Sequence, residues 1–386
     1  MASKGCLCVN QGDGEAGYAR NSAMQSAEQN KMKPIIEEAV TSLLKSATHV
    51  PSTMLIGDLG CSSGPNALGL VSTAVDAVFH RCAALNGQPP PELSVVLNDL
   101  PDNDFNYGCN NIYHKQTKNA TVYFSALQCI SPLKTLDLNT ADVAKRLVLL
   151  QQGTQSLGRV LTGIVPGSFY KRLFPSNSLH LVVSSNSLHW LSEAPEDLKS
   201  NSIPLHDEDE GLRRARRSMI IQAYRRQFRK DFTLFLNLRA QELVLGGRMV
   251  VCMLGSRGYH HMAPLSDISD IITSSLNDMA SRGVISRKML DCFYVPMHGP
   301  SDMELQEIIE DEGSFNLNKM EVHETEINVA APNMIARTMR ALFEPMMVHH
   351  FGLSGKLMDE FVRTLEQQLT PGSPQHAALH IDDRAT

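Results

Sequence analysis

The stretch Met54-Leu-Ile-Gly-Asp-Leu-Gly-Cys-Ser-Ser-Gly-Pro-Asn66 has the pattern of a short buried strand that runs into a glycine-rich turn. Gly60 and Gly64 give the turn backbone conformations that residues with a Cβ resist. We expect a helix to begin near Asn66, so that its unpaired N–H groups point at the turn. The end of this strand is therefore the first candidate for a ligand site.

A second buried run, Leu93-Ser-Val-Val-Leu97, lies about forty residues later and ends in Asn98-Asp99-Leu100-Pro101. This spacing fits a strand, a crossover helix over roughly 67–85 and a parallel strand beside the first. Asp58 and Asp99 then lie at neighbouring carboxyl ends, where open α/β sheets bind their ligands. A carboxylate at the end of the second strand is the usual partner of a ribose diol, so a nucleoside ligand is predicted.

The glycine-rich turn lacks the features of two common phosphate-binding motifs. It does not match G-x-G-x-x-G, and no Gly-Lys-Ser/Thr ending follows it. These differences argue against a dinucleotide and against a nucleoside triphosphate. A nucleoside without phosphates fits better. S-adenosylmethionine is the common one, so we predict it as the cofactor.

The composition predicts an intracellular, enzyme-sized protein with small-molecule partners. The chain has 386 residues, 42% of them hydrophobic, and a formal net charge of −6, which gives no electrostatic reason to expect nucleic acid or an anionic membrane as a partner. We find no run long enough for a signal peptide or a membrane span and expect the protein in the cytoplasm. The eight cysteines include no C-x-x-C pair. We therefore predict neither a metal site nor disulfides.

Strand-like runs near residues 54, 93, 179 and 249 alternate with helical patterns, which specifies an α/β fold with a doubly wound, mostly parallel sheet. The first helix is expected over about 33–45, and a long helix over about 218–243 that stops at Gly246-Gly247. We predict four regions: an N-terminal arm and lid helix at 1–50, a cofactor-binding α/β domain at 51–255 with an insertion at about 108–161, a mainly helical cap at 256–370, and a disordered tail at 371–386.

The arm before the first helix is rich in hydrogen-bonding side chains, namely Tyr18, Asn21, Ser22 and Gln25. These side chains would suit a lid over a polar ligand. A solvated loop with helix caps explains them equally well. Both interpretations stay open on the residues alone.

A further buried strand, Ser178-Leu-His-Leu-Val-Val-Ser184, ends in the polar stretch Ser185-Asn-Ser-Leu-His-Trp-Leu-Ser192. This stretch carries the only tryptophan of the chain. A buried indole N–H needs an acceptor, so Trp190 beside His189 is a candidate substrate-contacting pair. A core tryptophan beside a satisfied histidine is the alternative.

Two other patterns have ordinary structural explanations. The charged run from Asp207 to Arg217 is interpreted as a solvated helix face with i,i+4 ion pairs, rather than a nucleic-acid contact. The methionine-rich helical region beyond residue 256 is interpreted as core packing. An adaptable apolar pocket in that region is the alternative.

Together these motifs resemble the plant SABATH family of S-adenosylmethionine-dependent carboxyl methyltransferases, which includes salicylate, benzoate and jasmonate enzymes and the caffeine-pathway N-methyltransferases. The resemblance implies a Rossmann-like class I methyltransferase fold with a helical cap, and members of the family are commonly homodimers. The matching blocks follow one another through most of the chain, at 12–25, 58–66, 97–106, 165–175, 184–192, 235–254 and 336–345.

The resemblance also implies roles for individual residues. The cofactor contacts of the family fall on Ser22, Asp58, Asn66, Asp99, Leu100, Ser168 and Phe169, with Asp99 on the ribose and the last two residues by the adenine. We add Tyr18 of the arm and Gly60 of the turn to this set. The family's hydrogen bonds to the substrate carboxylate fall on Gln25 and Trp190. The substrate-pocket residues fall on Asn186, His189, Leu254, Ile268, Met339 and Leu342.

The chain departs from the salicylate enzymes at positions that bear on specificity. Asn10 stands where those enzymes carry a lysine against the carboxylate, and Asn186 stands where they have tyrosine. His189 replaces a methionine and is more similar to the benzoate and jasmonate members. Roughly forty extra residues lie between Asn106 and Val165.

The function that the resemblance implies is transfer of a methyl group from S-adenosylmethionine to the carboxylate of a small aromatic acid of benzoate, salicylate or cinnamate type. A carboxylic acid with a pKa near 4 is ionised at pH 7, so the reaction needs no general base. One alternative is methylation of a thiol, such as thiobenzoate, or of a ring nitrogen on the same scaffold. A thiol would need a lowered pKa or a nearby base, for which His189 is the only good candidate, so His189 joins Gln25 and Trp190 as a candidate catalytic residue. A non-catalytic small-molecule binding protein is the other.

Overall fold

The computed structural model describes residues 9–11, 14–46, 50–63, 66–85, 90–105, 125–126, 160–255, 265–323, 331–352 and 355–370. The chain divides into two compact units. The sheet unit consists of Met24–Ser185 and Gln241–Cys252, and the helical unit consists of Met1–Ala23, Asn186–Ala240 and Met253–Thr386. Our four chain-ordered regions stay a prediction. Gly64, most of the insertion at about 108–161 and the tail at 371–386 lie outside the described residues.

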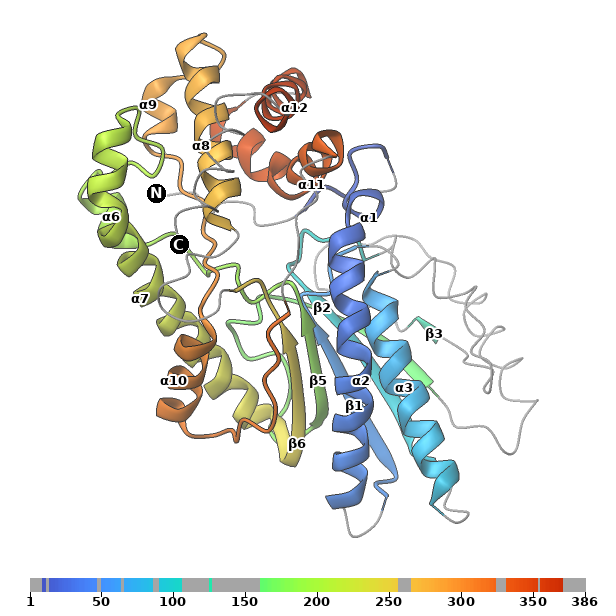
Figure 1. Ribbon diagram of the computed structural model, residues 1–386. Helices are drawn as coiled ribbons and strands as arrows, with labels where there is room; N and C mark the ends of the chain where they lie inside the picture. The colour runs from blue at the N-terminus through green and yellow to red at the C-terminus, as the bar shows by residue number, and fades with distance from the viewer. Residues whose placement is uncertain are drawn as a thin grey trace, which may run out of the picture. The chain divides into compact units, whose positions relative to one another are not determined.

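The sheet unit is built on a six-stranded sheet with the order β3-β4-β2-β1-β5-β6. All five strand pairs are parallel, and the chain winds outward from β1 in both directions, so the predicted doubly wound α/β fold is confirmed (Figure 1). The strands are β1 (Thr53–Leu59), β2 (Glu92–Asp99), β3 (Ser125–Ala126), β4 (Val160–Pro166), β5 (Leu179–Ser185) and β6 (Leu243–Cys252).

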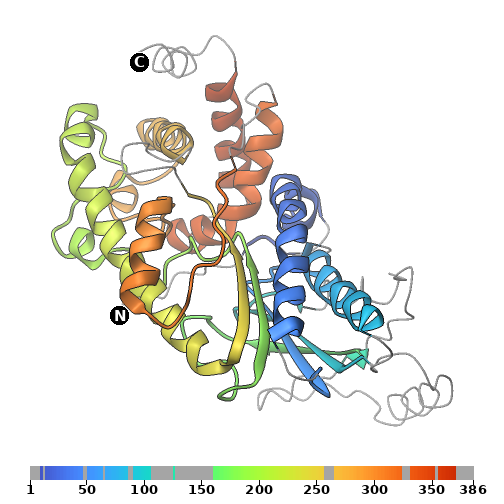
Figure 2. The ribbon, with the colours of Figure 1, turned by 60° about the horizontal axis from the view of Figure 1, so that its bottom comes forward.

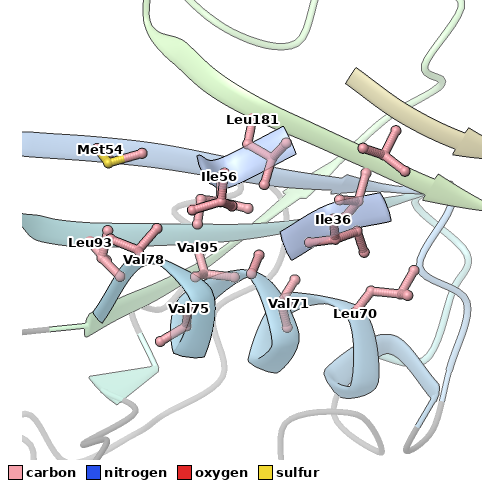
Figure 3. Close-up of a cluster of buried hydrophobic side chains, with 14 of the residues drawn as sticks. Ile36, Met54, Ile56, Leu70, Val71, Val75, Val78, Leu93, Val95 and Leu181 are labelled. Atoms are coloured by element: carbon pink, nitrogen blue, oxygen red, sulfur yellow. The ribbon is translucent and has the colours of Figure 1, made fainter. Parts of the chain in front are cut away.

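Helices α2 (Ala23–Ser46) and α3 (Asn66–Ala84) cover one face of this sheet (Figure 2). Their apolar side chains interlock with those of the strands in one core (Figure 3). Burial of each large aliphatic side chain contributes roughly 1.5–3 kcal/mol, so this core holds the two helices on the sheet. The labelled core residues are Ile36, Met54, Ile56, Leu70, Val71, Val75, Val78, Leu93, Val95 and Leu181.

The first long helix begins earlier than the sequence suggested. We expected it over about 33–45, whereas α2 begins at Ala23 and follows the short α1 (Tyr18–Asn21) almost directly. The segment 23–33 consists largely of Ala, Met, Gln, Glu and Lys, which are good helix formers even without an apolar stripe. Gln25 therefore lies on a helix and not in a loop of the arm.

The glycine pair at 246–247 does not end the long helix, as we had predicted. Helix α7 (Glu210–Glu242) ends before it, and both glycines lie inside β6. Gly246 has a φ of +78°, and the pairing of β5 with β6 shifts register between Leu179 and Leu181. The pair thus marks a strand irregularity, a position that also favours glycine.

Helix α7 also begins eight residues before the expected start, so it includes the basic part of the charged run. Arg214 pairs with Glu210 at 2.6 Å in an i,i+4 arrangement, and both side chains are exposed. The interpretation of this run as a solvated helix face is confirmed.

The helical unit contains α6 (Glu196–Ser200), most of α7, α8 (Leu265–Ser281), α9 (Arg287–Leu290), α10 (Asp302–Glu312), α11 (Pro332–Phe351) and α12 (Gly355–Leu369). Helix α12 packs against both α11 and α8 (Figure 1). The core of the helical unit includes Leu276, Met358 and Phe361, each fully buried. In the parts of the chain that the structure describes, no helix is long and apolar enough to cross a bilayer.

Candidate active site

The carboxyl ends of β1 and β2 bring Asp58 and Asp99 together, as their spacing predicted. The strands pair in register from Thr53 with Glu92 to Leu59 with Asn98. Asp99 extends its carboxylate back to the turn after β1, where Oδ2 accepts the N–H of Ser62 at 2.5 Å. Oδ1 accepts the N–H of Leu100 at 2.7 Å. Asp99 therefore ties the two strand ends to each other.

The turn after β1 has the backbone shape that its glycine content predicted. Gly60 has a φ of +75°, and the N–H groups of Gly60 and Cys61 both donate to the Asn98 carbonyl, at 2.8 and 2.9 Å. Ser62 also has a positive φ, +58°. A serine in this conformation is strained, and the hydrogen bond from its N–H to Asp99 helps to hold it there.

A buried acid and a partly buried acid at one strand edge are electrostatically costly. Asp58 is only 2% exposed, and burial, with a smaller contribution from the charge of Asp99, raises its pKa well above the ordinary value. Burial also raises the pKa of Asp99, while the N–H groups of Leu100 and Ser62 act in the opposite direction. A ligand with a positive charge would relieve this cost, since it favours the ionised form of both acids.

Asn98 organises the same edge and was missed as a site residue in the sequence. It is fully buried, and its Nδ2 donates to the carbonyls of Val165 at 2.7 Å and Gly167 at 2.9 Å. The Gly167 N–H in turn donates to the Asp99 carbonyl at 2.8 Å. An asparagine next to Asp99 in a largely apolar strand was the sequence signal that could have revealed this role. Asn98 thereby fixes the start of the loop that carries Ser168 and Phe169.

That loop is held from the other side by a second residue that the sequence did not reveal. The Glu242 carboxylate is fully buried, and its Oε1 accepts the N–H groups of Leu173 at 2.7 Å and Phe174 at 3.1 Å. Within the loop, the Ser168 hydroxyl accepts the Tyr170 N–H at 3.2 Å. The rings of Phe169 and Tyr170 meet edge to face at 4.7 Å. The loop is thus braced at both ends.

Three other predicted site residues lie in the sheet unit. Leu100 directly follows Asp99, and Asn66 is the first residue of α3, as expected. Gln25 lies in the first turn of α2. Its buried Oε1 has no hydrogen-bond partner among the described residues.

In the helical unit, His189 and Trp190 lie in a turn that pairs with another segment. Trp190 forms an antiparallel bridge with Met297, and the rings of His189 and Trp190 are 5.9 Å apart. His189 is 4% exposed, and burial lowers its pKa to about 4. Its Nδ1 has no hydrogen-bond partner in the part of the chain that the structure describes. His189 is therefore neutral at physiological pH.

Trp190 packs into the apolar cluster of the helical unit. Its ring meets that of Phe343 edge to face at a centroid distance of 6.1 Å. Met339 is a buried member of this cluster, and Leu342 packs against it. Both of these α11 residues were predicted pocket residues, whereas Phe343 was missed, although it lies in the same matched block. Most of the methionine-rich region is therefore core packing, while Trp190 and Leu342 are only partly buried at the edge of this cluster.

The other predicted pocket residues are Leu254, Asn186 and Ile268. Leu254 is 39% exposed, and Asn186 begins the turn before His189 with a φ of +54°. Ile268 lies in α8, but its side chain is outside the described part. Asn10, which replaces the lysine of the salicylate enzymes, donates from Nδ2 to the Glu344 carboxylate and to the Ala16 carbonyl.

The arm of the helical unit is held against α11. Asn10 N–H donates to the Ala341 carbonyl at 2.8 Å, and the Thr338 hydroxyl donates to the Asn21 carbonyl at 3.0 Å. Tyr18 and Ser22 are buried here, at 8% and 3% exposed. The solvated-loop interpretation of the arm is therefore wrong for these two residues.

A family model described as SAM dependent carboxyl methyltransferase matches residues 4–381 of the chain. The chain belongs to this family. It is 33% identical to jasmonate O-methyltransferase of Arabidopsis thaliana over 407 residues, which covers 97% of the chain and 96% of the relative. It is 31% identical to anthranilate O-methyltransferase 2 of Zea mays over 385 residues, with 95% and 94% covered.

The fold agrees with this assignment. A solved structure of loganic acid methyltransferase with SAH has a TM-score of 0.69 and 24% sequence identity, and the match covers 95% of this chain and 94% of that one. The methyltransferase is therefore an S-adenosylmethionine-dependent enzyme with a class I α/β fold. The resemblance to the SABATH family is confirmed, and a non-catalytic binding protein is no longer an alternative.

The burial of Asp58 in the methyltransferase gives a stability prediction. Asp58→Asn is expected to raise the melting temperature of the cofactor-free enzyme at pH 8, because the raised pKa of Asp58 means that its ionisation opposes folding. This penalty is complete above the folded pKa and vanishes below the unfolded one. The expected result is a positive shift of the melting temperature at pH 8.

Differential scanning fluorimetry between pH 4 and pH 8 would measure this effect. The difference between the variant and the wild type should shrink as the pH falls. An Asp58→Asn enzyme that is less stable than the wild type at pH 8 would show that the carboxylate has a partner that offsets its burial.

Proposed function

We propose that this methyltransferase esterifies the carboxylate of a small aromatic acid of benzoate, salicylate or cinnamate type. The observation that supports an aromatic acid is the apolar wall of Trp190, Phe343, Met339 and Leu342. Aromatic rings prefer edge-to-face or offset contacts with other rings, and a methionine-rich wall adapts to flat substrates. Anthranilate, the acceptor named for one relative, is such an acid.

The residues at the ends of β1 and β2 fit S-adenosylmethionine. We propose that Asp99 accepts hydrogen bonds from the ribose, and that Ser168 and Phe169 flank the adenine. Asp58 and Asp99 carry raised pKa values, which matches a ligand whose sulfonium and ammonium groups are positive. The proposed cofactor set is completed by Tyr18, Ser22, Gly60, Asn66 and Leu100.

S-adenosylmethionine supplies a methyl group on a positively charged sulfur. In the proposed reaction a carboxylate oxygen forms the new bond to the methyl carbon while the carbon–sulfur bond breaks and its electron pair stays on sulfur. Gln25 and Trp190 are proposed to hold the carboxylate by hydrogen bonds. Their contribution is orientation, which is worth up to roughly 7–11 kcal/mol in favourable cases.

Methylation of an aliphatic thiol fits the structure less well than ester formation. An aliphatic thiol with a pKa near 8.5 must lose its proton to attack, and His189 was the candidate base. Burial lowers the pKa of His189 to about 4, which makes it a weak base. A carboxylic acid needs no such base, because it is already ionised at neutral pH. The low basicity of His189 therefore favours the carboxylate over an aliphatic thiol, and thiobenzoate, which is also ionised at neutral pH, is distinguished by the acceptor panel.

The same reasoning predicts the pH dependence of turnover. With acid and cofactor both saturating, kcat should be constant between about pH 6 and pH 8, because the acid is ionised and His189 stays neutral in this range. Initial rates in overlapping buffers would measure the profile. A limb near pH 6.5 that disappears in His189→Gln would show that this histidine titrates and would contradict the proposal.

The acceptor class is tested by comparing kcat/KM over a panel of acids. Benzoic, salicylic, anthranilic and cinnamic acids represent the proposed class, with jasmonic and indole-acetic acids as larger acids and thiobenzoic acid and xanthosine as other acceptors. The highest kcat/KM is expected for one of the first four. A clear preference for jasmonic acid would overturn the aromatic assignment and keep the carboxylate.

Two further properties are proposed on the resemblance alone. We expect the enzyme to be a homodimer in the cytoplasm, as members of the family commonly form dimers. Light scattering coupled to gel filtration should give about twice the mass of one chain. A monomeric mass at working enzyme concentration would remove the dimer from the proposal.

A further inference from the structure

The turn that carries Trp190 is held by hydrogen bonds at successive residues. The backbone N–H of Trp190 donates to the Ser187 carbonyl at 3.0 Å, and the backbone N–H of Leu191 donates to the Pro296 carbonyl at 2.8 Å. The next amide, that of Ser192, donates to a side chain instead. The far end of the turn is therefore held by a side-chain acceptor, in addition to the backbone pairing around Trp190.

That acceptor is the carboxylate of Asp231 on α7. Its Oδ2 accepts the Ser192 N–H at 2.8 Å. Its Oδ1 accepts the Ser192 hydroxyl at 2.7 Å and Nε2 of Gln227 at 3.0 Å. Asp231 is 1% exposed and Gln227 is 8% exposed. Three hydrogen-bond donors therefore meet at the buried carboxylate of Asp231. Two of them belong to Ser192, which lies two residues after Trp190 in the chain.

Burial of a carboxylate costs free energy. Its desolvation opposes folding unless strong hydrogen bonds offset it. Hydrogen bonds to an ionised acceptor are short and roughly twice as strong as neutral ones, so Asp231 holds Ser192 more rigidly than a serine or an asparagine would. The Trp190 ring also contacts Phe343 and the surrounding cluster. Asp231 therefore helps to fix the backbone from which this ring projects.

We propose that Asp231 is a positioning residue for the acid substrate. It holds Ser192, and through Ser192 it sets the direction in which the Trp190 indole meets the substrate carboxylate. Asp231 itself does not touch the acid. This inference rests on the proposed function, because it takes Trp190 as a group that binds the carboxylate. Misplacement of such a group by about 1 Å can lower the rate by about a hundredfold.

Trp190 is the only tryptophan of the chain, so intrinsic fluorescence reports on this turn directly. In Asp231→Ala, the emission should shift to the red and acrylamide should quench it more strongly. The kcat/KM for the acid should fall by about ten- to a hundredfold, while the Kd of S-adenosylmethionine stays unchanged. In Asp231→Asn, one amide oxygen can still accept the Ser192 N–H, so most of both properties should be restored.

Asp207 offers a matched control in the same unit. Its carboxylate accepts the Asp209 N–H at 3.1 Å and pairs with Arg216 at 2.7 Å. Asp207→Ala should leave the tryptophan emission and the acid kinetics as in the wild type. If Asp231→Ala does not fold, Ser192→Ala removes one of the three donors. Its quenching should then change in the same direction by a smaller amount.

Unchanged emission and quenching in the folded Asp231 and Ser192 variants would overturn the inference. Equal losses of cofactor affinity and of kcat/KM for the acid would also overturn it, since they indicate general damage. The fluorescence measurement does not require turnover. A wild-type enzyme that esterifies no acid would therefore defeat the proposed function while the test of Asp231 could still be read.

Discussion

Asp99→Ala is expected to weaken the binding of S-adenosylmethionine by at least about a hundredfold, equivalent to about 2.8 kcal/mol. The variant loses the proposed ribose acceptor. It also leaves the N–H of Ser62 without its acceptor, and this residue already has a φ of +58°. The turn after β1 should therefore relax away from its binding geometry. Isothermal titration calorimetry with S-adenosylmethionine measures the loss.

Asp102 provides the control for this variant. It lies three residues further on, is exposed, and carries the same carboxylate. Asp102→Ala should bind the cofactor as the wild type does. Normal cofactor affinity in Asp99→Ala would remove the basis for placing the ribose at the end of β2.

Trp190→Ala is expected to lower kcat for the acid by about a hundredfold, with little change in the Kd of S-adenosylmethionine. The variant removes both the indole N–H proposed for the carboxylate and the ring that meets Phe343. Trp190→Phe keeps a ring and removes only the N–H. It should therefore lie between the alanine variant and the wild type, which separates the two contributions.

Stopped-flow or steady-state kinetics with the best acid of the panel would give kcat, and calorimetry would give the cofactor affinity of the same preparations. Equal losses of turnover and of cofactor affinity in Trp190→Ala would count against a role for Trp190 on the acid. Such a result would instead indicate that the residue supports the fold of its unit.

Local patterns predicted the sheet and one side of the site well. The apolar run before Gly60 and the run before Asp99 determine two adjacent strands, because the crossover rule leaves one arrangement for them. The positions of Asp58 and Asp99 at one edge follow from that topology. The positive φ of Gly60 follows from residue type.

The parts that the sequence did not reveal depend on contacts between distant residues. Glu242 reaches the loop at 173–174 across about seventy positions of the chain, and no local pattern marks that pairing. Asp231 likewise holds Ser192 from about forty residues away. The glycine pair in β6 was misinterpreted because glycine favours both helix ends and strand irregularities. Only the pairing of β5 with β6 shows that these glycines mark a strand irregularity and not a helix end.

A carboxylate oxygen of the acid is expected to receive the methyl group of S-adenosylmethionine. The most direct measurement incubates the enzyme with S-adenosylmethionine labelled in its methyl group and, in parallel, with the acid of highest kcat/KM, thiobenzoic acid or xanthosine, and identifies the products by mass spectrometry. We expect one labelled methyl ester, with no label on sulfur or nitrogen. Label found only on a thiol or a ring nitrogen would contradict this expectation, and His189 and Asn186 would then be the next residues to replace.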